Sequence, residues 1–137
     1  MIPEEKDLTF KTLIFLHGYG VRGYYWEGIK PFFESKFAQV FTPDLQMRDI
    51  NLLIKSTKKY ISDIVNKYDT TVYLIGHSLG GAIGALVCQD LGSAIHKFAG
   101  IAVPYGEQQI TFKKFTRYLV RHQLIPGFIW SHINLIS

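Results

Sequence analysis

Apolar and polar positions are arranged in blocks along this chain, and the blocks predict strands that alternate with helices. Apolar runs rich in β-branched and aromatic residues end at glycine or proline, which is typical of strands buried on both faces of a parallel sheet. They cover residues 11–16, 39–42, 71–75 and 98–103. Between them the pattern predicts helices over residues 26–36 and 49–68, and a third helix that follows residues 76–80 and runs to about residue 91. Pro31 requires the first of these to become regular close to that residue.

The clearest helix is the one predicted over residues 49–68. Its apolar residues recur every three or four positions, and lysines and an aspartate occupy the opposite side. The apolar side consists of Ile50, Leu53, Ile54, Thr57, Tyr60, Ile61, Ile64, Val65 and Tyr68. We expect this side to face the core.

The alternation of strands and helices predicts the α/β class, with a mainly parallel sheet of about four strands, right-handed crossovers and helices on both faces. Residues 11–106 fit this plan. Residues 110–137 do not extend it, because an aromatic helical stripe surrounded by Lys and Arg is followed by Pro126-Gly127 and a further apolar run. We expect a single domain over residues 1–137, with a cap-like or dimerising tail at 110–137.

The stretch from Val72 to Ala85 predicts a reactive serine. A β-branched run leads into Gly76-His77-Ser78-Leu79-Gly80, and the small residues that follow suit a tightly packed helix. In this strand, turn and helix context, G-x-S-x-G is typical of a nucleophile elbow that exposes the serine Oγ at the carboxyl edge of the sheet. Ser78 is therefore the candidate nucleophile, and a purely structural turn serine is the alternative. The residues match neither phosphate-binding pattern, G-x-x-x-x-G-K-[ST] or G-x-G-x-x-G.

A second motif, His17-Gly18-Tyr19-Gly20, follows the predicted strand at 11–16. If that strand neighbours the strand before Ser78, the loop passes beside Ser78 and a backbone N–H of the loop can stabilise an oxyanion. A second N–H would come from Leu79, directly after the nucleophile. The alternative is a tight turn made of small residues.

Composition favours a globular protein with one core, since 47% of the 137 residues are apolar. Residues 1–92 hold ten Lys or Arg and ten Asp or Glu, whereas residues 93–137 hold five cations and one acid, so the net charge of +4 lies in the last third. A basic tail can favour anionic partners, although a solvated helix face is the simpler explanation. Nucleic-acid binding is not expected, because no recognition motif accompanies the cations.

The remaining composition adds little chemistry. The single cysteine, Cys88, lies among apolar residues of the helix predicted to end near residue 91 and is expected in the core. The N-terminal residues show no secretory pattern, and no run approaches the roughly 18 apolar residues of a membrane span. We expect a cytoplasmic protein without an integral membrane segment. The motifs require no metal or organic cofactor.

Together, HGYG after the first strand, TPDL closing the second and GHSLGG after the third resemble the α/β-hydrolase superfamily of esterases, lipases, thioesterases and related acyl hydrolases. The resemblance covers about residues 11–106, the N-terminal core portion of that fold, so the chain resembles a truncated or minimal version of it. It implies that Ser78 is the nucleophile and that the amides of Tyr19 and Leu79 form the oxyanion hole. It also implies that the other motif residues, His17, Gly18, Gly76, His77 and Gly80, are structural or line the pocket, and that a helical cap begins near Ile110.

In that superfamily the catalytic residues run Ser, then Asp or Glu, then His along the chain, on loops after later strands. Here the sequence ends where those strands should begin, and it lacks the family's preceding antiparallel hairpin. Glu107, just past the last predicted strand, is the candidate acid, and a surface glutamate is the alternative. Asp90 lies inside a predicted helix.

The candidate base is His132, provided that the apolar run at 128–136 folds back toward Ser78. A core or partner-facing histidine is the alternative. His122 lies on the edge of an amphipathic helix and is a weaker candidate. We expect His96 to precede a strand and so to lie at the wrong end of the sheet.

Two explanations of the missing parts stay open. The sequence is either an N-terminal portion of a longer protein, or a minimal protein that uses Glu107 and His132 or residues of a partner chain, such as a homodimer formed through the tail or the sheet edge. The first functional hypothesis is a serine hydrolase, esterase-like or lipase-like, that cleaves small-molecule carboxylic esters or thioesters through an acyl-enzyme on Ser78. The second is a catalytically incomplete fragment or pseudoenzyme that acts by binding or assembly.

Overall fold

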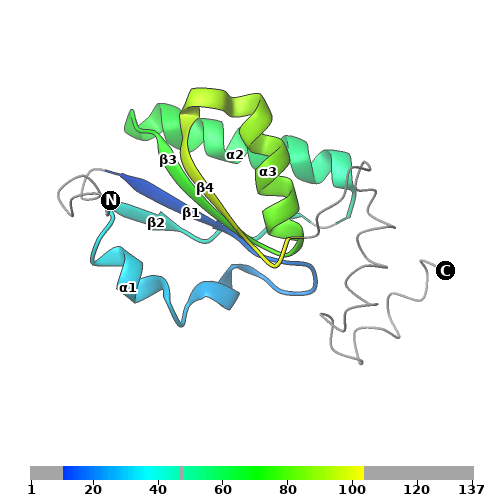
Figure 1. Cartoon of the computed structure of the whole chain (residues 1–137), viewed down its shortest axis with the longest axis horizontal. Coiled ribbons are helices and arrows are strands. Elements are labelled where there is room, and N and C mark those ends of the chain that lie inside the picture. The colour runs from blue at the N-terminus through cyan, green and yellow to red at the C-terminus, as the bar shows by residue number, and fades with distance from the viewer. Residues whose placement is uncertain (1–10, 47, 104–137) are drawn as a thin grey trace. The chain divides into compact units, whose positions relative to one another are not determined.

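The structure, a computed structural model, describes residues 11–46 and 48–103 of the chain. Four strands in these residues form one sheet in the order β2-β1-β3-β4 (Figure 1). Their bounds are β1 (Thr12–Leu16), β2 (Gln39–Phe41), β3 (Val72–His77) and β4 (Ile95–Ile101). All neighbouring strands run parallel. The predicted α/β class and parallel sheet are therefore confirmed.

Helices cover the sheet from both sides. The helices α2 (Ile50–Tyr68) and α3 (Leu79–Leu91) lie over one face, and the 3-10 turn η2 (Gly23–Trp26) with the short helix α1 (Lys30–Glu34) lies over the other (Figure 1). A second 3-10 turn, η3 (Gly92–Ala94), leads from α3 into β4. Because the four strands are parallel, their carboxyl ends all meet at one edge of the sheet, where the two predicted motifs lie.

Two predicted starts are wrong by three residues or more. The helix predicted from residue 26 begins at Lys30, because Pro31 suits only the first turn of an α-helix and residues 23–26 form the separate turn η2. The strand predicted from residue 98 begins at Ile95, since Gly92, at φ 50°, ends α3 and η3 needs only three residues to turn the chain. His96 therefore lies inside β4 and does not precede the strand.

Helix α2 has the predicted apolar side. Leu53, Thr57, Ile61 and Ile64 are buried along it, at intervals of three and four residues. The helix begins after Asp49, whose side chain accepts a hydrogen bond from the backbone N–H of Leu52 at 2.8 Å. This N-cap satisfies one of the amides that a helix start leaves without an acceptor.

The opposite face of the sheet holds an aromatic core. Phe15 stacks on Trp26 with ring centroids 4.5 Å apart, and Phe33 meets Phe15 edge-on at 5.2 Å. Leu13 completes the fully buried part of this cluster. These contacts fix η2 and α1 against β1, so the loop between β1 and η2 is anchored at both ends.

Burial differs among the strands. All five residues of β1 are buried, as expected for a central strand, and β3 alternates between buried and partly buried positions. Most of β4 is exposed, including Ile101 at 49%, so the expectation of a strand buried on both faces is wrong for β4. This strand lies at an edge of the sheet and pairs only with β3 among the described strands.

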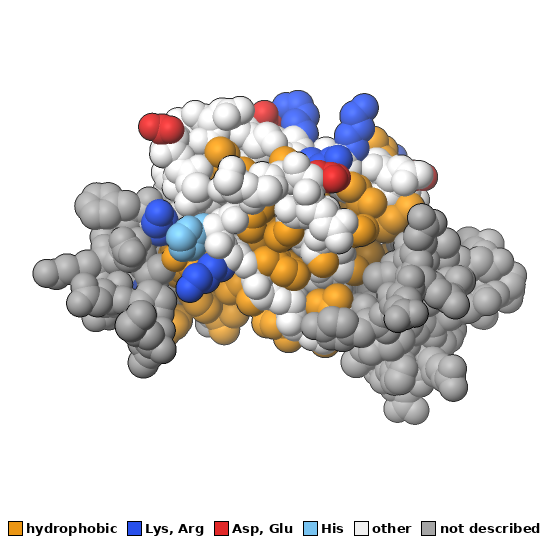
Figure 2. All heavy atoms as spheres, turned by 45° about the horizontal axis from the view of Figure 1, so that its top comes forward, with side chains coloured by type: hydrophobic (Ala, Val, Ile, Leu, Met, Phe, Trp, Pro, Cys, Tyr) orange, Lys and Arg blue, Asp and Glu red, His pale blue; other side chains and the backbone are white. Residues whose placement is uncertain are grey.

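The surface over α2 and α3 combines charged and apolar side chains. Charged side chains stand out along the upper rim of the face in Figure 2, and apolar side chains are visible across its centre. Within residues 11–46 and 48–103, no helix has the length and hydropathy needed to cross a bilayer.

Candidate active site

Ser78 lies in the tight turn between β3 and α3. Its backbone adopts φ 56° and ψ −117°, in the region of positive φ that favours glycine and that other residues occupy at a cost of about 1–3 kcal/mol. Two hydrogen bonds hold the turn: Ser78 N–H donates to the Ile101 carbonyl at 2.9 Å, and Ala82 N–H donates to the Ser78 carbonyl at 3.1 Å. The turn is therefore tied both to β4 and to the first turn of α3.

Two glycines allow this turn to pack closely. A Cβ on Gly76 would lie 2.6 Å from the carbonyl carbon of Gly80, and a Cβ on Gly80 would lie 2.6 Å from the carbonyl carbon of Leu16. Both distances are shorter than van der Waals contact, and the obstructing atoms belong to the backbone. The G-x-S-x-G spacing thus lets α3 start directly against the ends of β3 and β1.

The loop after β1 lies beside Ser78, as predicted. Strands β1 and β3 are neighbours, with Leu16 paired to Gly76, so they end side by side. A Cβ on Gly18 would lie 3.3 Å from the Cβ of Ser78. Tyr19, which follows Gly18, is half-buried. Leu79 is the first residue of α3, and its N–H belongs to the helix-start amides that have no acceptor within the helix.

His17 has a structural role in this loop. It is fully buried, and its Nε2 accepts a hydrogen bond from the Leu45 backbone N–H at 2.8 Å. The proton therefore resides on Nδ1, which donates to the Gly18 carbonyl at 2.8 Å. Burial lowers the pKa of His17, which outweighs the raising effects of the hydrogen bond to Gly18 and of the Asp44 charge. A neutral ring with both nitrogens engaged cannot serve as the base for Ser78.

Asp44 is a site residue that the sequence did not single out. Its carboxylate accepts a hydrogen bond from the Gly23 backbone N–H at 2.8 Å. Together with the bond between His17 and Leu45, this contact fastens both ends of the loop at 17–23 to the segment after β2. The sequence held one indication of this contact: the TPDL segment follows a strand that ends at the same edge of the sheet as the loop at 17–23.

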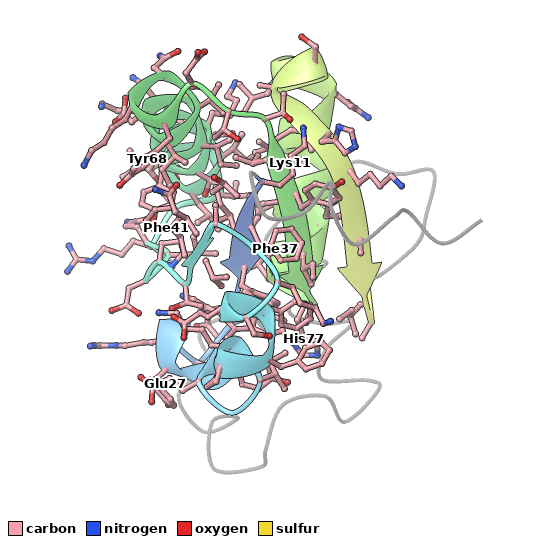
Figure 3. All side chains as sticks on the ribbon, turned by 90° about the vertical axis from the view of Figure 1, so that its left-hand side faces the viewer. Lys11, Glu27, Phe37, Phe41, Tyr68 and His77 are labelled. Atoms are coloured by element: carbon pink, nitrogen blue, oxygen red, sulfur yellow. The ribbon has the colours of Figure 1, made fainter. Side chains whose placement is uncertain are left out.

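His77 packs between aromatic rings beside the turn. Tyr25 stacks on its ring with centroids 5.3 Å apart, and Trp26 meets it edge-on at 6.5 Å. Figure 3 shows His77 at the carboxyl ends of the strands, next to the turns of η2 and α1. Burial lowers the pKa of this imidazole, so the neutral ring is favoured. The resemblance implies a structural or pocket-lining residue, and this stays a prediction.

Two further residues that could titrate, His96 and Asp90, lie away from Ser78. His96 lies near the amino end of β4, where its ring contacts Tyr73 at 4.8 Å, so it is at the far end of the sheet as expected. Asp90 pairs with Lys58 on the surface at 2.9 Å. Glu107, His122 and His132 lie outside the described residues, as does the whole tail at 110–137.

Two further features lie away from the turn. Cys88 is half-buried on α3, and burial raises the pKa of its thiol, which disfavours the reactive thiolate. A groove of about 330 Å³ runs along the edge strand β2, and Figure 3 labels Phe37, Phe41 and Tyr68 among its lining residues. Since none of its lining residues belongs to the β3–α3 turn or to the loop after β1, this groove is separate from the candidate active site.

A comparison with models of protein families shows to which family this chain belongs. The model of the alpha/beta hydrolase family matches residues 13–129, which is most of the chain. The chain belongs to the alpha/beta hydrolase family. The turn at Ser78 and the loop at Gly18 are therefore features of an alpha/beta hydrolase core. A comparison with curated protein sequences finds no match.

Solved structures share the fold at low sequence identity. A variant of the pyrethroid hydrolase PytH is 20% identical, with a TM-score of 0.63 over 77% of this chain and 45% of that protein. Polyneuridine aldehyde esterase is 23% identical, with a TM-score of 0.61 over 81% and 48%. An extracellular alpha/beta-hydrolase from a Paenibacillus species is 19% identical, with a TM-score of 0.59 over 78% and 49%. This chain thus spans less than half the length of each of these proteins.

Proposed function

We propose that this alpha/beta hydrolase is an esterase-like serine hydrolase that forms an acyl-enzyme on Ser78 with carboxylic esters or thioesters. The observation that carries the proposal is the backbone of Ser78, held at positive φ between β3 and α3 with the Gly18 loop against it. A strained turn is retained only where the surrounding structure enforces it, and such strain gathers at functional sites. The names of similar structures, which include esterases and hydrolases, agree with this class of reaction.

In this reaction the Ser78 Oγ attacks the acyl carbonyl carbon and gives its proton to a base. The carbonyl oxygen becomes an oxyanion, for which we assign the backbone amides of Leu79 and Tyr19 as donors. Collapse of the tetrahedral intermediate breaks the bond to the leaving alcohol or thiol, which takes the proton back from the base. Water then hydrolyses the acyl-enzyme by the same steps in reverse.

The general base must come from outside the described residues, because His17, His77 and His96 are all unsuited to that role. Both nitrogens of His17 are engaged, the His77 ring packs between Tyr25 and Trp26, and His96 lies at the far end of the sheet. His132 as base and Glu107 as its acid remain our candidates in this chain. A longer parent protein or a partner chain is the other source of these groups.

A fluorophosphonate probe tests the nucleophile. We expect labelling of the wild-type chain and of Ser93→Ala, a control that removes an exposed hydroxyl from η3, and no labelling of Ser78→Ala. A folded wild-type chain that stays unlabelled would refute the proposal for this chain. Circular dichroism of each sample verifies that the fold is retained.

The same probe tests the predicted base and acid. Removing a general base slows attack by about 10²–10⁴-fold. His132→Asn and Glu107→Gln are therefore expected to slow labelling of Ser78 strongly, and His122→Asn is the matched control. Labelling at the wild-type rate in His132→Asn would show that another group accepts the proton.

The second candidate function is a catalytically incomplete alpha/beta hydrolase that binds or assembles without turnover. It is favoured by the absence, among the described residues, of a histidine suited to serve Ser78 as base. Under this alternative, ester turnover would be very low and unchanged by Ser78→Ala. Turnover of a p-nitrophenyl acyl ester by wild type, and its loss in Ser78→Ala, would exclude it.

A further inference from the structure

The chain bends sharply at Ala102, directly after β4. Ala102 adopts φ 52°, a backbone region that residues other than glycine occupy only where the surrounding structure enforces it. The residue before it, Ile101, accepts the hydrogen bond from the Ser78 N–H at 2.9 Å. The bend therefore lies beside the turn that carries the candidate nucleophile.

After this bend the Val103 side chain lies in a gap that two glycines leave between β4 and α3. A Cβ on Gly100 would lie 2.6 Å from Val103 Cγ2, and a Cβ on Gly81 would overlap the same methyl group. Gly100 belongs to β4 and Gly81 to the first turn of α3. Figure 1 shows the end of β4 beside the start of α3. The valine methyl group thus fills the space that two absent side chains would otherwise occupy.

We propose that Val103 is a positioning residue for Ser78, which holds the first turn of α3 in place through its contact with Gly81. That turn begins with Leu79, whose amide we assign to the oxyanion. An oxyanion donor acts only if it lies about 2.7–3.1 Å from the developing charge, so a small shift of α3 would weaken it. Because Ile101 bonds to Ser78, the end of β4 contacts this turn on both sides of Leu79.

Val103 is only half-buried, so its contribution to the core is smaller than that of a fully buried valine. Its contact with Gly81 is therefore the feature that most distinguishes it. The positioning role rests on the proposed function, whereas the packing of Val103 between the two glycines does not.

The role is tested by the rate at which a fluorophosphonate labels Ser78. Val103→Ala removes the methyl group from the gap, and we expect labelling to slow about tenfold, less than the 10²–10³-fold effect of losing an oxyanion donor outright. Val87→Ala is the matched control, because it makes the same truncation at a fully buried position in the second half of α3. It should lower the melting temperature at least as much as Val103→Ala and still label at the wild-type rate. A wild-type rate in Val103→Ala, or equal slowing in both variants, would overturn the role.

A second substitution tests the gap itself. Gly100→Ala places a methyl group against Val103 Cγ2 and should also slow labelling when made alone. In Val103→Ala/Gly100→Ala the new methyl group takes the space that the valine leaves, since its other near neighbours, atoms of the Phe98 ring, lie at 3.4 and 3.5 Å. This double variant is expected to label faster than either single variant, as contacting residues that compensate each other do. Effects that simply multiply would overturn the proposal.

NMR tests the packing without any reaction at Ser78. The amide signals of Leu79 and Gly80 should move in Val103→Ala and return toward their wild-type positions in the double variant, whereas Val87→Ala should leave them in place. If wild type is not labelled, the proposed function fails, and these signals alone decide whether Val103 holds the start of α3. Unchanged Leu79 and Gly80 signals in Val103→Ala would refute that contact.

Discussion

Ser78 occupies a backbone conformation that suits glycine better than serine, and this has a measurable cost. The strain at φ 56° is worth about 1–3 kcal/mol, while glycine loses roughly 0.5–1 kcal/mol more chain entropy than alanine on folding. Relief of strain is the larger effect. We therefore predict that Ser78→Gly unfolds with a free energy about 1 kcal/mol greater than that of Ser78→Ala.

Urea unfolding of both variants measures this difference. Both variants lose the hydroxyl, so the comparison isolates the Cβ. Equal stabilities, or a more stable alanine variant, would mean that the turn relaxes around a side chain at no cost.

Gly80 is the second residue in this turn where the surrounding backbone requires a glycine. A Cβ there would overlap the backbone carbonyls of Leu16, the last residue of β1, and of His17, and backbone atoms cannot move aside as a flexible side chain can. We predict that Gly80→Ala lowers the free energy of unfolding by about 1–3 kcal/mol or more. Gly28→Ala is the matched control, because no atom outside its chain neighbours lies within 4 Å of the added Cβ. Thermal melts of the two variants should separate clearly, and similar melting temperatures would contradict the close packing of this turn.

At the scale of elements, one side chain stabilises the first turn of helix α2. Asp49 caps the helix through its bond to Leu52, and loss of such a cap costs about 1 kcal/mol. We predict this loss of stability for Asp49→Ala in urea unfolding. Asp63→Ala removes an exposed carboxylate from the same helix, where it pairs with Lys59, and should cost only a few tenths of a kcal/mol. Equal effects would show that the cap contributes nothing beyond surface charge.

Elements defined by local pattern were predictable, and elements defined by distant contacts were not. The apolar spacing predicted a helix over residues 49–68, and α2 spans Ile50–Tyr68, within one residue of the predicted start. The start of β4 was missed because the turn η3 depends on how α3 ends against the sheet. The turn at Ser78 could be predicted because its glycines are adjacent in sequence. The bonds from His17 to Leu45 and from Gly23 to Asp44 join residues 28 and 21 positions apart, which no local pattern encodes.

At the scale of the whole molecule, two histidines make stability depend on pH. Burial lowers the pKa of both His17 and His77 in the folded state, so folding favours their neutral forms. Their contribution is fully present above the unfolded pKa of 6.5 and is lost as the pH falls below it, because the unfolded chain then binds more protons. We predict a melting temperature that is steady from pH 7 to 8 and falls between pH 6.5 and 5.

Comparison with His77→Asn assigns part of this slope, because asparagine does not titrate. The variant should lose less stability than wild type over the same interval. A melting temperature that rises on acidification would contradict the assigned direction of both pKa changes.

The hydrogen bond between Ser78 N–H and the Ile101 carbonyl has a consequence for local opening of the sheet. This bond is the amide's attachment to β4, a largely exposed edge strand whose backbone can separate from β3 without unfolding of the central strand β1. Each such opening would release the Ser78 amide to solvent while the buried amides of β1 stay protected. Hydrogen exchange at this single amide thus reports how often β4 separates from β3. Any chain segment or ligand that holds β4 in place would also slow the exchange of the Ser78 amide.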